Sequence, residues 1–266
     1  MSFSISGKTA IVTGGANGIG LAIGKHFVDK GANVMFADID EKQLVHELGR
    51  NEDGSATRYF AGDLREKLTL ANLLSATIDA FDQVDILVNA SRQVLPSDPL
   101  NPDDDAVEIL LNQNLITSLR LTQLVAKRMM KQAEDREEGS AGTIVNLSSI
   151  AARRTHPDLM AYSVASAALD QMTRSMAVAL APHRIRVNAV AFGSVMSASL
   201  QGTLKENRDY RADIEEHTPL GRIASATELA DAVQYLASDG SGFMTGQIMT
   251  VDGGRTLLDP VAAPAH

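Results

Sequence analysis

The stretch Thr13–Gly20 reads TGGANGIG and follows an apolar run that begins near Lys8. Glycine tolerates a positive φ and lets a backbone approach a ligand closely, so Gly14, Gly18 and Gly20 suit a tight turn from a strand into a helix. The start of such a helix offers unpaired N–H groups and a partial positive charge to phosphates. The stretch therefore predicts a Rossmann-type turn that binds the pyrophosphate of a dinucleotide.

Short β-branched runs alternate with amphipathic stretches along the 266 residues, as in a parallel sheet joined by crossover helices. Most of the runs are nearly continuously apolar, which is typical of strands covered on both faces. We expect strands at 8–13, 33–37, 56–61, 84–88, 143–147, 184–190 and 247–251. We expect helices at about 18–30, 41–48, 66–81, 103–132, 159–181 and 225–237. The predicted fold class is α/β: a Rossmann-type, doubly wound, seven-stranded parallel sheet with helices on both faces.

A chain of this length suits a single domain, which we assign to residues 1–255. Residues 194–218 lack clean periodicity and follow the sixth expected strand, at the edge of the sheet where open α/β folds bind ligands. We expect a substrate lid there, with an apolar pocket formed by Met196, Leu200, Leu204 and Tyr210. Residues 256–266 are expected to form a frayed C-terminal tail.

Composition excludes several classes of function. The formal net charge of −9 repels phosphate backbones and anionic bilayers, so neither nucleic acid nor a membrane is an expected partner. The absence of cysteine excludes disulfides, thiolate catalysis and cysteine-ligated metals. The six histidines show no HExxH spacing, and no metal is expected. We find no signal-peptide pattern and no apolar run long enough to span a bilayer, which predicts a cytoplasmic protein.

Asp38 closes the second expected strand, 18 residues after Gly20. A carboxylate at this place would accept hydrogen bonds from the adenosine ribose hydroxyls of a bound dinucleotide. It would also repel a 2′-phosphate, and positions 39 and 40 hold Ile39 and Asp40 rather than a basic residue. The sequence therefore favours NAD over NADP.

Between Gly7 and about Gly254 the chain resembles the classical short-chain dehydrogenases/reductases. The resemblance rests on TGGANGIG, Asp63-Leu64, Asn89-Ala90, Asn114, IVNLSS at 144–149, Tyr162, RVNAV at 186–190 and TVDGG at 250–254, in the family's order. It implies hydride transfer between nicotinamide and the carbon of a small-molecule secondary alcohol or ketone. It also implies a homotetramer or homodimer formed through the two long helices expected at 103–132 and 159–181.

The resemblance assigns roles to individual residues. Ser149 would hydrogen-bond the substrate oxygen, Tyr162 would donate or accept its proton, and Asn114 would hold a relay water. Ser149 is preferred to Ser148 because it lies 13 residues before Tyr162, the family's spacing. Asp63 would contact the adenine and Asn89 would lie near the nicotinamide-side ribose. The full set of implied cofactor contacts is Gly14, Asn17, Gly18, Ile19, Gly20, Asp38, Asp63, Leu64, Asn89, Ala90 and Val195.

The sequence departs from the family at the lysine of Tyr-x-x-x-Lys, where Ser166 stands. Residues four apart share a helix face, so the family's lysine lies one turn from the tyrosine. There its ammonium stabilises the tyrosinate and hydrogen-bonds the nicotinamide ribose. Ser166 could bond a ribose hydroxyl but carries no charge. Two further departures are Asn89-Ala90-Ser91 for the family's Asn-Ala-Gly, and Phe192-Gly193 for its Pro-Gly.

Three arginines are candidates for the missing charge: Arg92, Arg153 and Arg154. We expect one guanidinium within ~6 Å of the Tyr162 hydroxyl in the cofactor-bound protein, and solvent exposure is the alternative for each. Two functions stay open: an NAD-dependent oxidoreductase with an altered proton relay, and an inactive dinucleotide-binding scaffold or regulatory partner. A resemblance to halohydrin dehalogenases is weaker, because those relatives remodel the glycine turn that is complete here.

Overall fold

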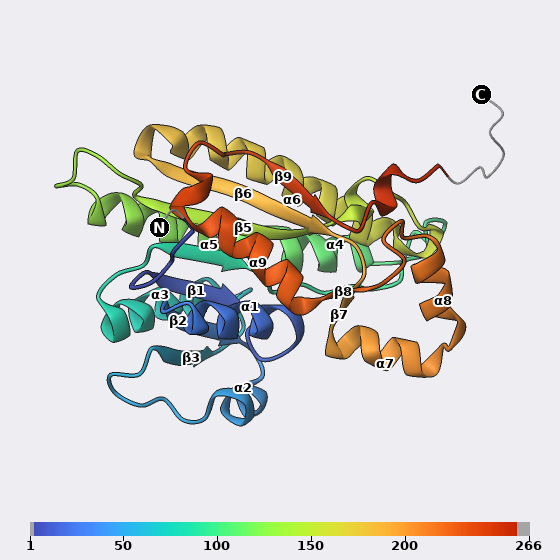
Figure 1. The fold of residues 1–266 in the computed structure, drawn as a ribbon, viewed down its shortest axis with the longest axis horizontal. Helices are drawn as coiled ribbons and strands as arrows, with labels where there is room; N and C mark the ends of the chain where they lie inside the picture. The colour runs from blue at the N-terminus through green and yellow to red at the C-terminus, as the bar shows by residue number, and fades with distance from the viewer. Residues whose placement is uncertain (1–2, 260–266) are drawn as a thin grey trace.

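The computed structural model describes residues 3–259 and centres on a parallel sheet of seven strands (Figure 1). The strand order is β3-β2-β1-β4-β5-β6-β9. The strands are β1 (Thr9–Thr13), β2 (Asn33–Asp38), β3 (Thr57–Ala61), β4 (Ile86–Asn89), β5 (Gly142–Ser149), β6 (Ile185–Phe192) and β9 (Ile248–Val251). The predicted fold class is confirmed, and the expected strands match the observed ones to within two residues at either end.

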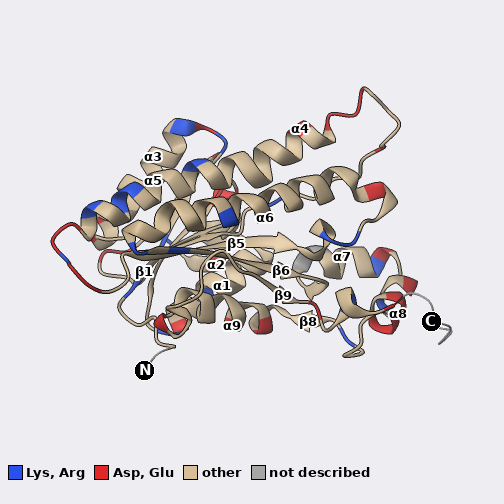
Figure 2. Ribbon diagram, turned by 90° about the horizontal axis from the view of Figure 1, so that it is seen from above, with Lys and Arg blue, Asp and Glu red and all other residues tan. Residues whose placement is uncertain are grey.

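Helices cover both faces of the sheet, as Figure 2 shows. One face carries α3 (Lys67–Phe81), α5 (Thr117–Gln132) and α6 (Met160–Leu180), and the other carries α1 (Gly18–Asp29), α2 (Glu41–Leu48) and α9 (Ala226–Ala237). Successive side chains of a strand point to opposite faces. Ile11 of β1 accordingly packs in the core beneath α3 and α5, and Val12 packs in the core beneath α1 and α9. This double burial explains why most of the strands are nearly continuously apolar.

The strand order reverses at β1, which pairs with β2 on one side and with β4 on the other. The chain builds β1, β2 and β3 outward in one direction and then returns to the opposite side of β1 to begin β4. The loops that leave β1 and β4 therefore diverge at the carboxyl ends of the strands. A crevice at such a reversal point is where open α/β sheets bind ligands.

The prediction of one continuous helix at 103–132 is wrong. This segment consists of α4 (Ala106–Leu110), a π-helical turn at Leu111–Ile116, and α5. Apolar periodicity alone does not reveal the extra residue of a π-turn, because the pattern resumes on the next turn.

The segment expected to be an irregular lid holds regular structure. It contains β7 (Val195–Met196), α7 (Ala198–Glu206) and α8 (Asp209–Glu216), and β7 pairs with the short β8 (Ala224–Ser225). Most described residues of α7 and α8 are exposed, so these helices carry no apolar stripe from which sequence periodicity could reveal them. Of the predicted C-terminal tail, residues 260–266 lie outside the described residues.

Candidate active site

The turn between β1 and α1 requires glycine. Gly14 has a φ of 68°, and a Cβ on it would lie 2.9 Å from the carbonyl oxygen of Ala90. A Cβ on Gly20 would collide with the Gly14 carbonyl group, because α1 packs directly against the turn. Gly18 begins α1 with a φ of 53°. The backbone can therefore come close to a pyrophosphate here, and the first N–H groups of α1, near Asn17 and Ile19, are available to it.

Asp38 lies at the carboxyl end of β2, beside this turn. Its Oδ2 accepts a hydrogen bond from the Ala16 N–H at 3.0 Å, and its Oδ1 accepts one from the Asp40 N–H at 3.1 Å. The carboxylate is thus fixed to the glycine turn. Ile39 beside it is exposed and offers no charge to a 2′-phosphate.

Asp63 and Leu64 follow β3. The Arg65 guanidinium donates to both oxygens of the Asp63 carboxylate, with Nε 2.9 Å from Oδ1 and Nη2 2.6 Å from Oδ2. The Arg65 guanidinium lowers the pKa of Asp63 below its usual range. Leu64 is buried in the core beneath α3 and α5. The side chain that the resemblance directs to the adenine is therefore half-buried and ion-paired in this structure.

The loop after β4 is tied to β1. The hydroxyl of Thr13 accepts hydrogen bonds from the N–H groups of Ala90 and Ser91, both at 2.9 Å. The buried side chain of Asn89 donates to the Asn146 Oδ1 at 2.8 Å and to the Thr122 hydroxyl at 3.2 Å. The Asn89 side chain thus links β4 to β5 and α5, whereas the backbone of Ala90 is the part that faces Gly14.

The π-helical turn places Asn114 against the same loop. Its Oδ1 accepts a hydrogen bond from the Gln93 N–H at 2.8 Å, and its Nδ2 donates to the Gln93 carbonyl oxygen at 2.9 Å. The neighbouring Gln113 donates to the Ser91 hydroxyl at 3.0 Å. Both ends of the Asn114 amide therefore hold the loop in place. The sequence does not predict that Asn114 positions this loop. Its hydrogen bonds go to the backbone of Gln93, and any residue at position 93 other than proline could form them.

Ser149, Tyr162 and Ser166 are brought to one edge of the sheet. Ser149 ends β5 opposite Phe192 of β6, and its hydroxyl accepts a hydrogen bond from the Ala151 N–H at 3.1 Å. Tyr162 and Ser166 lie one turn apart near the start of α6, and all three side chains are buried. The Tyr162 ring belongs to a small apolar cluster with residues of α4, including Leu110.

Arg92 reaches Tyr162 from the loop after β4. Its Nη1 lies 2.5 Å from the Tyr162 hydroxyl oxygen, and its guanidinium carbon lies 4.3 Å from the centroid of the Phe192 ring. The other two candidate arginines bind elsewhere: Arg153 donates to the Thr250 hydroxyl at 2.7 Å, and Arg154 donates to the carbonyl oxygen of Thr256. Of the three, the structure brings Arg92 together with the tyrosine.

A small cavity adjoins this group and is lined by Asn89, Arg92, Asn114, Tyr162 and Ser166, among others. Its volume of about 10 Å³ leaves room for one water molecule at most. The side chains around Tyr162 are therefore closely packed, and Ser166 and Arg92 both line this small cavity.

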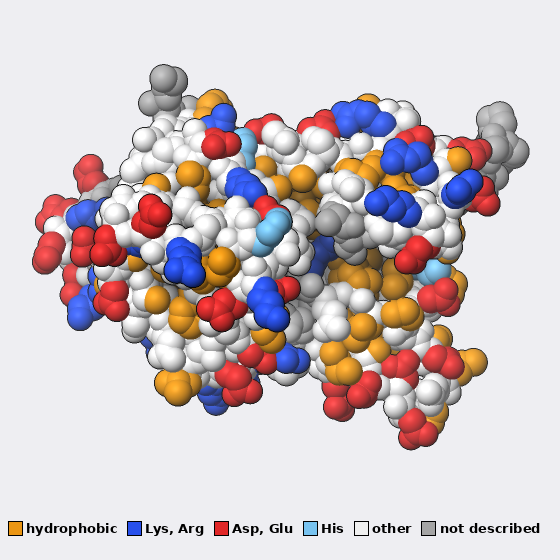
Figure 3. All heavy atoms as spheres, turned by 90° about the horizontal axis from the view of Figure 1, so that it is seen from below, with side chains coloured by type: hydrophobic (Ala, Val, Ile, Leu, Met, Phe, Trp, Pro, Cys, Tyr) orange, Lys and Arg blue, Asp and Glu red, His pale blue; other side chains and the backbone are white. Residues whose placement is uncertain are grey.

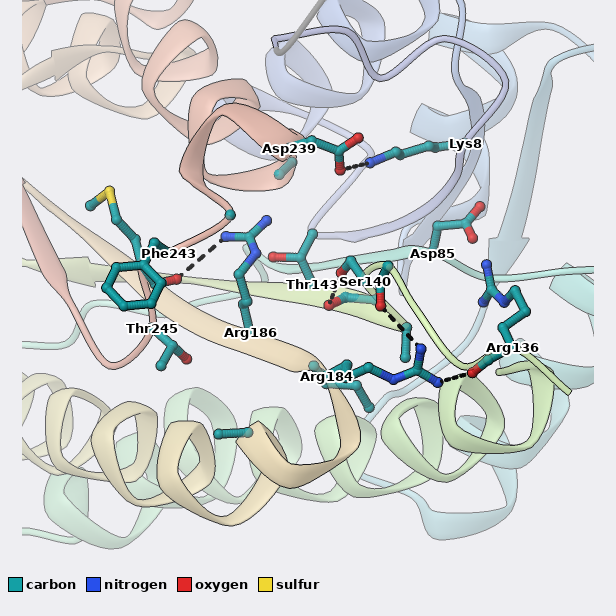
Figure 4. Close-up of a pocket in the computed structure, with 18 residues that line it drawn as sticks. Lys8, Asp85, Arg136, Ser140, Thr143, Arg184, Arg186, Asp239, Phe243 and Thr245 are labelled. Atoms are coloured by element: carbon teal, nitrogen blue, oxygen red, sulfur yellow. Dashed lines mark hydrogen bonds and ion pairs between the residues drawn. The ribbon is translucent and has the colours of Figure 1, made fainter. Parts of the chain in front are cut away.

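A much larger cavity, of about 910 Å³, lies at the opposite edge of the sheet (Figure 4). It is lined by residues that precede or begin β1, β4, β5 and β6, among them Lys8, Asp85, Thr143 and Arg186. The partly buried Asp85 accepts a hydrogen bond from the Thr9 N–H at 2.8 Å, and desolvation raises the pKa of its carboxyl group. Because the strands are parallel, this cavity is separated from Tyr162 by the length of the sheet and is not part of the candidate active site.

The predicted lid follows β6 on the side of the glycine turn. Val195 is buried, whereas Met196, Leu200 and Leu204 are partly buried and Tyr210 is exposed. In Figure 3, hydrophobic side chains gather around a hollow toward the end of the molecule that carries α7 and α8. An apolar substrate could bind in such a hollow.

The fold and the site define a Rossmann-type protein with a glycine turn, a serine and a tyrosine at the carboxyl edge of a parallel sheet. Residues 14–256 match the family described as enoyl-(acyl carrier protein) reductase. The chain therefore belongs to this family of short-chain dehydrogenases/reductases, whose members are oxidoreductases.

Several individual proteins are similar over nearly the whole chain. L-fucose dehydrogenase of Mus musculus is 33% identical, with 95% of this chain and 89% of the relative covered. Cis-4-hydroxycyclohexanecarboxylate dehydrogenase of Sinomonas cyclohexanicum is 32% identical, with 97% and 100% covered. A solved 7α-hydroxysteroid dehydrogenase, in complex with NADH and 7-oxo glycochenodeoxycholic acid, is 28% identical at a TM-score of 0.85, with 95% and 96% covered.

Within residues 3–259, no helix is long and apolar enough to cross a membrane. Over the same range, no group of three or more histidine, aspartate or glutamate side chains is placed to hold a metal ion.

Proposed function

We propose that the protein is an NAD-dependent oxidoreductase that transfers a hydride between nicotinamide and the carbon of a secondary alcohol or ketone. The observation that carries the proposal is the buried Tyr162 hydroxyl, held at 2.5 Å by the Arg92 guanidinium at the same edge of the sheet as the glycine turn. The solved relative that contains NADH together with a 7-oxo compound supports a ketone as one form of the substrate.

The chain's own residues would handle the oxygen and its proton. Ser149 hydrogen-bonds the substrate oxygen, and Tyr162 takes the proton of the alcohol during oxidation or returns it to the ketone during reduction. The bound dinucleotide supplies or accepts the hydride. Asn114 fixes the loop that carries Arg92 through its two bonds to Gln93. Gly14, Gly18 and Gly20 provide the close backbone approach that the pyrophosphate needs.

NAD rather than NADP is the proposed cofactor because Asp38 is fixed beside the glycine turn. Its carboxylate suits the two ribose hydroxyls of NAD and would repel the 2′-phosphate of NADP. The substrate proposed is a small cyclic alcohol or ketone, since the three similar proteins are named for a sugar, a cyclohexane derivative and a steroid.

A second copy of this chain is the proposed partner, in a homodimer or homotetramer. The outer face of α6 exposes Val164 and Val178, at 42% and 77% of their surface. Burying apolar side chains of this kind against the same helix of another protomer would be favourable. Size-exclusion chromatography with light scattering tests this assembly.

The function is tested by measuring NADH and NADPH binding by calorimetry, and turnover with a panel of cyclic and aliphatic alcohols and ketones. We expect tighter binding of NADH and measurable turnover that Ser149→Ala and Tyr162→Phe each reduce by about a hundredfold or more. The alternative is an inactive dinucleotide-binding protein, which the serine at position 166 favours. NADH binding without turnover of any panel member would support that alternative.

A further inference from the structure

We propose that Arg92, from the loop after β4, supplies the positive charge that stabilises the tyrosinate of Tyr162 and replaces the missing lysine of α6. The proposal rests on the proposed function in one respect only, the use of Tyr162 as the proton-transferring group. Its physical basis is the 2.5 Å contact between Arg92 Nη1 and the Tyr162 hydroxyl oxygen.

The Arg92 charge is not neutralised by a neighbouring acid. Within residues 3–259, no carboxylate lies within 4.0 Å of its guanidinium nitrogens. The side chain is partly buried, so water screens its charge less than it would at the surface. An unpaired, partly buried guanidinium beside a phenol favours the ionised form of that phenol.

The position of Arg92 is built into the fold. Ser91 before it is held by the Thr13 hydroxyl, and Gln93 after it is held through its N–H and carbonyl groups by Asn114. The side chain then lies against the Phe192 ring, at 4.3 Å from guanidinium carbon to ring centroid. Backbone anchors on both sides and a ring against the guanidinium hold the cation at the tyrosine before any ligand binds.

Other charges near this part of the molecule are directed elsewhere. Arg153 and Arg154 bond Thr250 and the carbonyl of Thr256. On the packed elements, Glu108 of α4 and Asp158, which precedes α6, are exposed. The buried Asp170 lies two turns along α6 from Tyr162 and has Arg153 4.0 Å away. Among the described residues that line the small cavity with Tyr162, Arg92 is the one with a formal charge.

The proton balance leaves the arginine unchanged. In alcohol oxidation, the O–H bond of the substrate breaks and its proton passes to the tyrosinate, while the hydride leaves the substrate carbon for the dinucleotide. Arginine keeps its proton throughout because a guanidinium is not deprotonated in proteins. Arg92 thus acts as a fixed charge that sets the pH range in which the tyrosinate is present.

The decisive measurement is the pH at which tyrosinate absorbance develops, because it does not depend on turnover. The chain has four tyrosines, so the Tyr162 contribution is the difference between each protein and its Tyr162→Phe counterpart. We expect Arg92→Gln to move this transition upward by at least about two pH units, because the variant removes a unit charge in direct contact with the phenolate oxygen. Arg92→Lys should move it less, and Arg154→Gln, which changes an exposed arginine away from the site, should leave it in place.

A second variant guards against simple misfolding. Ser166→Lys, added to Arg92→Gln, restores a cation one helical turn from Tyr162 and should return the transition toward that of the natural protein. An unshifted transition in a folded Arg92→Gln variant would overturn the inference, as would a shifted one that Ser166→Lys does not reverse. A shift in a protein that turns over no substrate would instead support the role of Arg92 and refute the proposed oxidoreductase activity.

Discussion

The guanidinium of Arg92 lies over the ring of Phe192, with 4.3 Å between the guanidinium carbon and the ring centroid. Phe192 ends β6, directly opposite Ser149 of β5 in the sheet register. The ring therefore connects the strand end that carries the candidate serine with the side chain that holds the candidate tyrosine. Phe192, one of the three departures from the family pattern, takes part in this contact, and Ser91, a second departure, directly precedes Arg92.

Replacing Phe192 tests whether the ring positions Arg92. Phe192→Leu removes the cation–π contact but keeps an apolar side chain, and a contact of this kind contributes about 1 kcal/mol. We expect kcat/KM for alcohol oxidation to fall about fivefold and its pH profile to move upward. Phe60→Leu, which changes a partly buried phenylalanine on β3, is the matched control. Equal effects of the two variants would mean that the ring contributes packing alone.

Replacing Gly20 tests whether the glycine turn binds the dinucleotide. Gly20→Ala places a Cβ against the carbonyl group of Gly14, so either the turn or α1 must shift. We expect NADH affinity to fall at least tenfold and the melting temperature to drop by several degrees. Gly202→Ala in the exposed helix α7 meets nothing within 4 Å and should not weaken NADH binding. Normal NADH affinity in Gly20→Ala would contradict the assignment of this turn to the cofactor.

Replacing Asp38 tests the choice between NADH and NADPH. Asp38→Asn keeps an oxygen that can accept the hydrogen bond from the Ala16 N–H but removes the negative charge. The ratio of the Kd for NADPH to the Kd for NADH should fall by about tenfold, measured by calorimetry, because the repulsion of the 2′-phosphate is lost. Asp40→Asn, at the N-cap of α2, removes a nearby charge while keeping a good cap and should change the ratio far less.

Asp170 provides a prediction about stability and pH. Burial raises the pKa of its carboxyl group, and its Oδ1 has no hydrogen-bond partner. The folded protein therefore binds this proton more tightly than the unfolded chain does. The associated stability is present at low pH and is lost as the pH rises through the folded-state pKa.

The matching variant is Asp170→Asn. At neutral pH it should raise the melting temperature by a few degrees, because it removes an ionised carboxylate from a buried site, and the gain should shrink as the pH is lowered. Asp79→Asn, on the exposed face of α3, should show no such trend in calorimetric scans. A gain that does not depend on pH would show that the Asp170 charge is not its source.

Strands that are covered on both faces could be predicted from the sequence because most of their residues must be apolar. The run that forms β6, for example, is buried at every residue. The two lid helices were missed for the converse reason, since exposed helices need no apolar stripe. The π-turn at Leu111–Ile116 was missed because it displaces the helical pattern by one residue without changing composition.

For the site, the sequence supplied the residue types and their spacing but not their pairing. Gly14, Ser149 and Tyr162 lie at one edge of the sheet because each is at the end of a strand or near the start of a helix, and their motif positions indicate this placement. Arg92 could be named only as one of three candidates. Its selection depends on the Asn114–Gln93 bonds and on the ring of Phe192, which are contacts between segments distant in the sequence.

The two hydrogen bonds between Asn114 and the backbone of Gln93 affect how related sequences should be compared. If Arg92 supplies the charge, position 166 of α6 is free to vary. The requirement for particular residues then falls on three separate segments, those that contain Arg92, Asn114 and Phe192. Descendants of such a protein would then keep or lose Arg92, Asn114 and Phe192 together, while position 166 drifts among small residues. A missing lysine would mark a relocated function in those lineages rather than an abandoned one, and the loop after the fourth strand would distinguish the two histories.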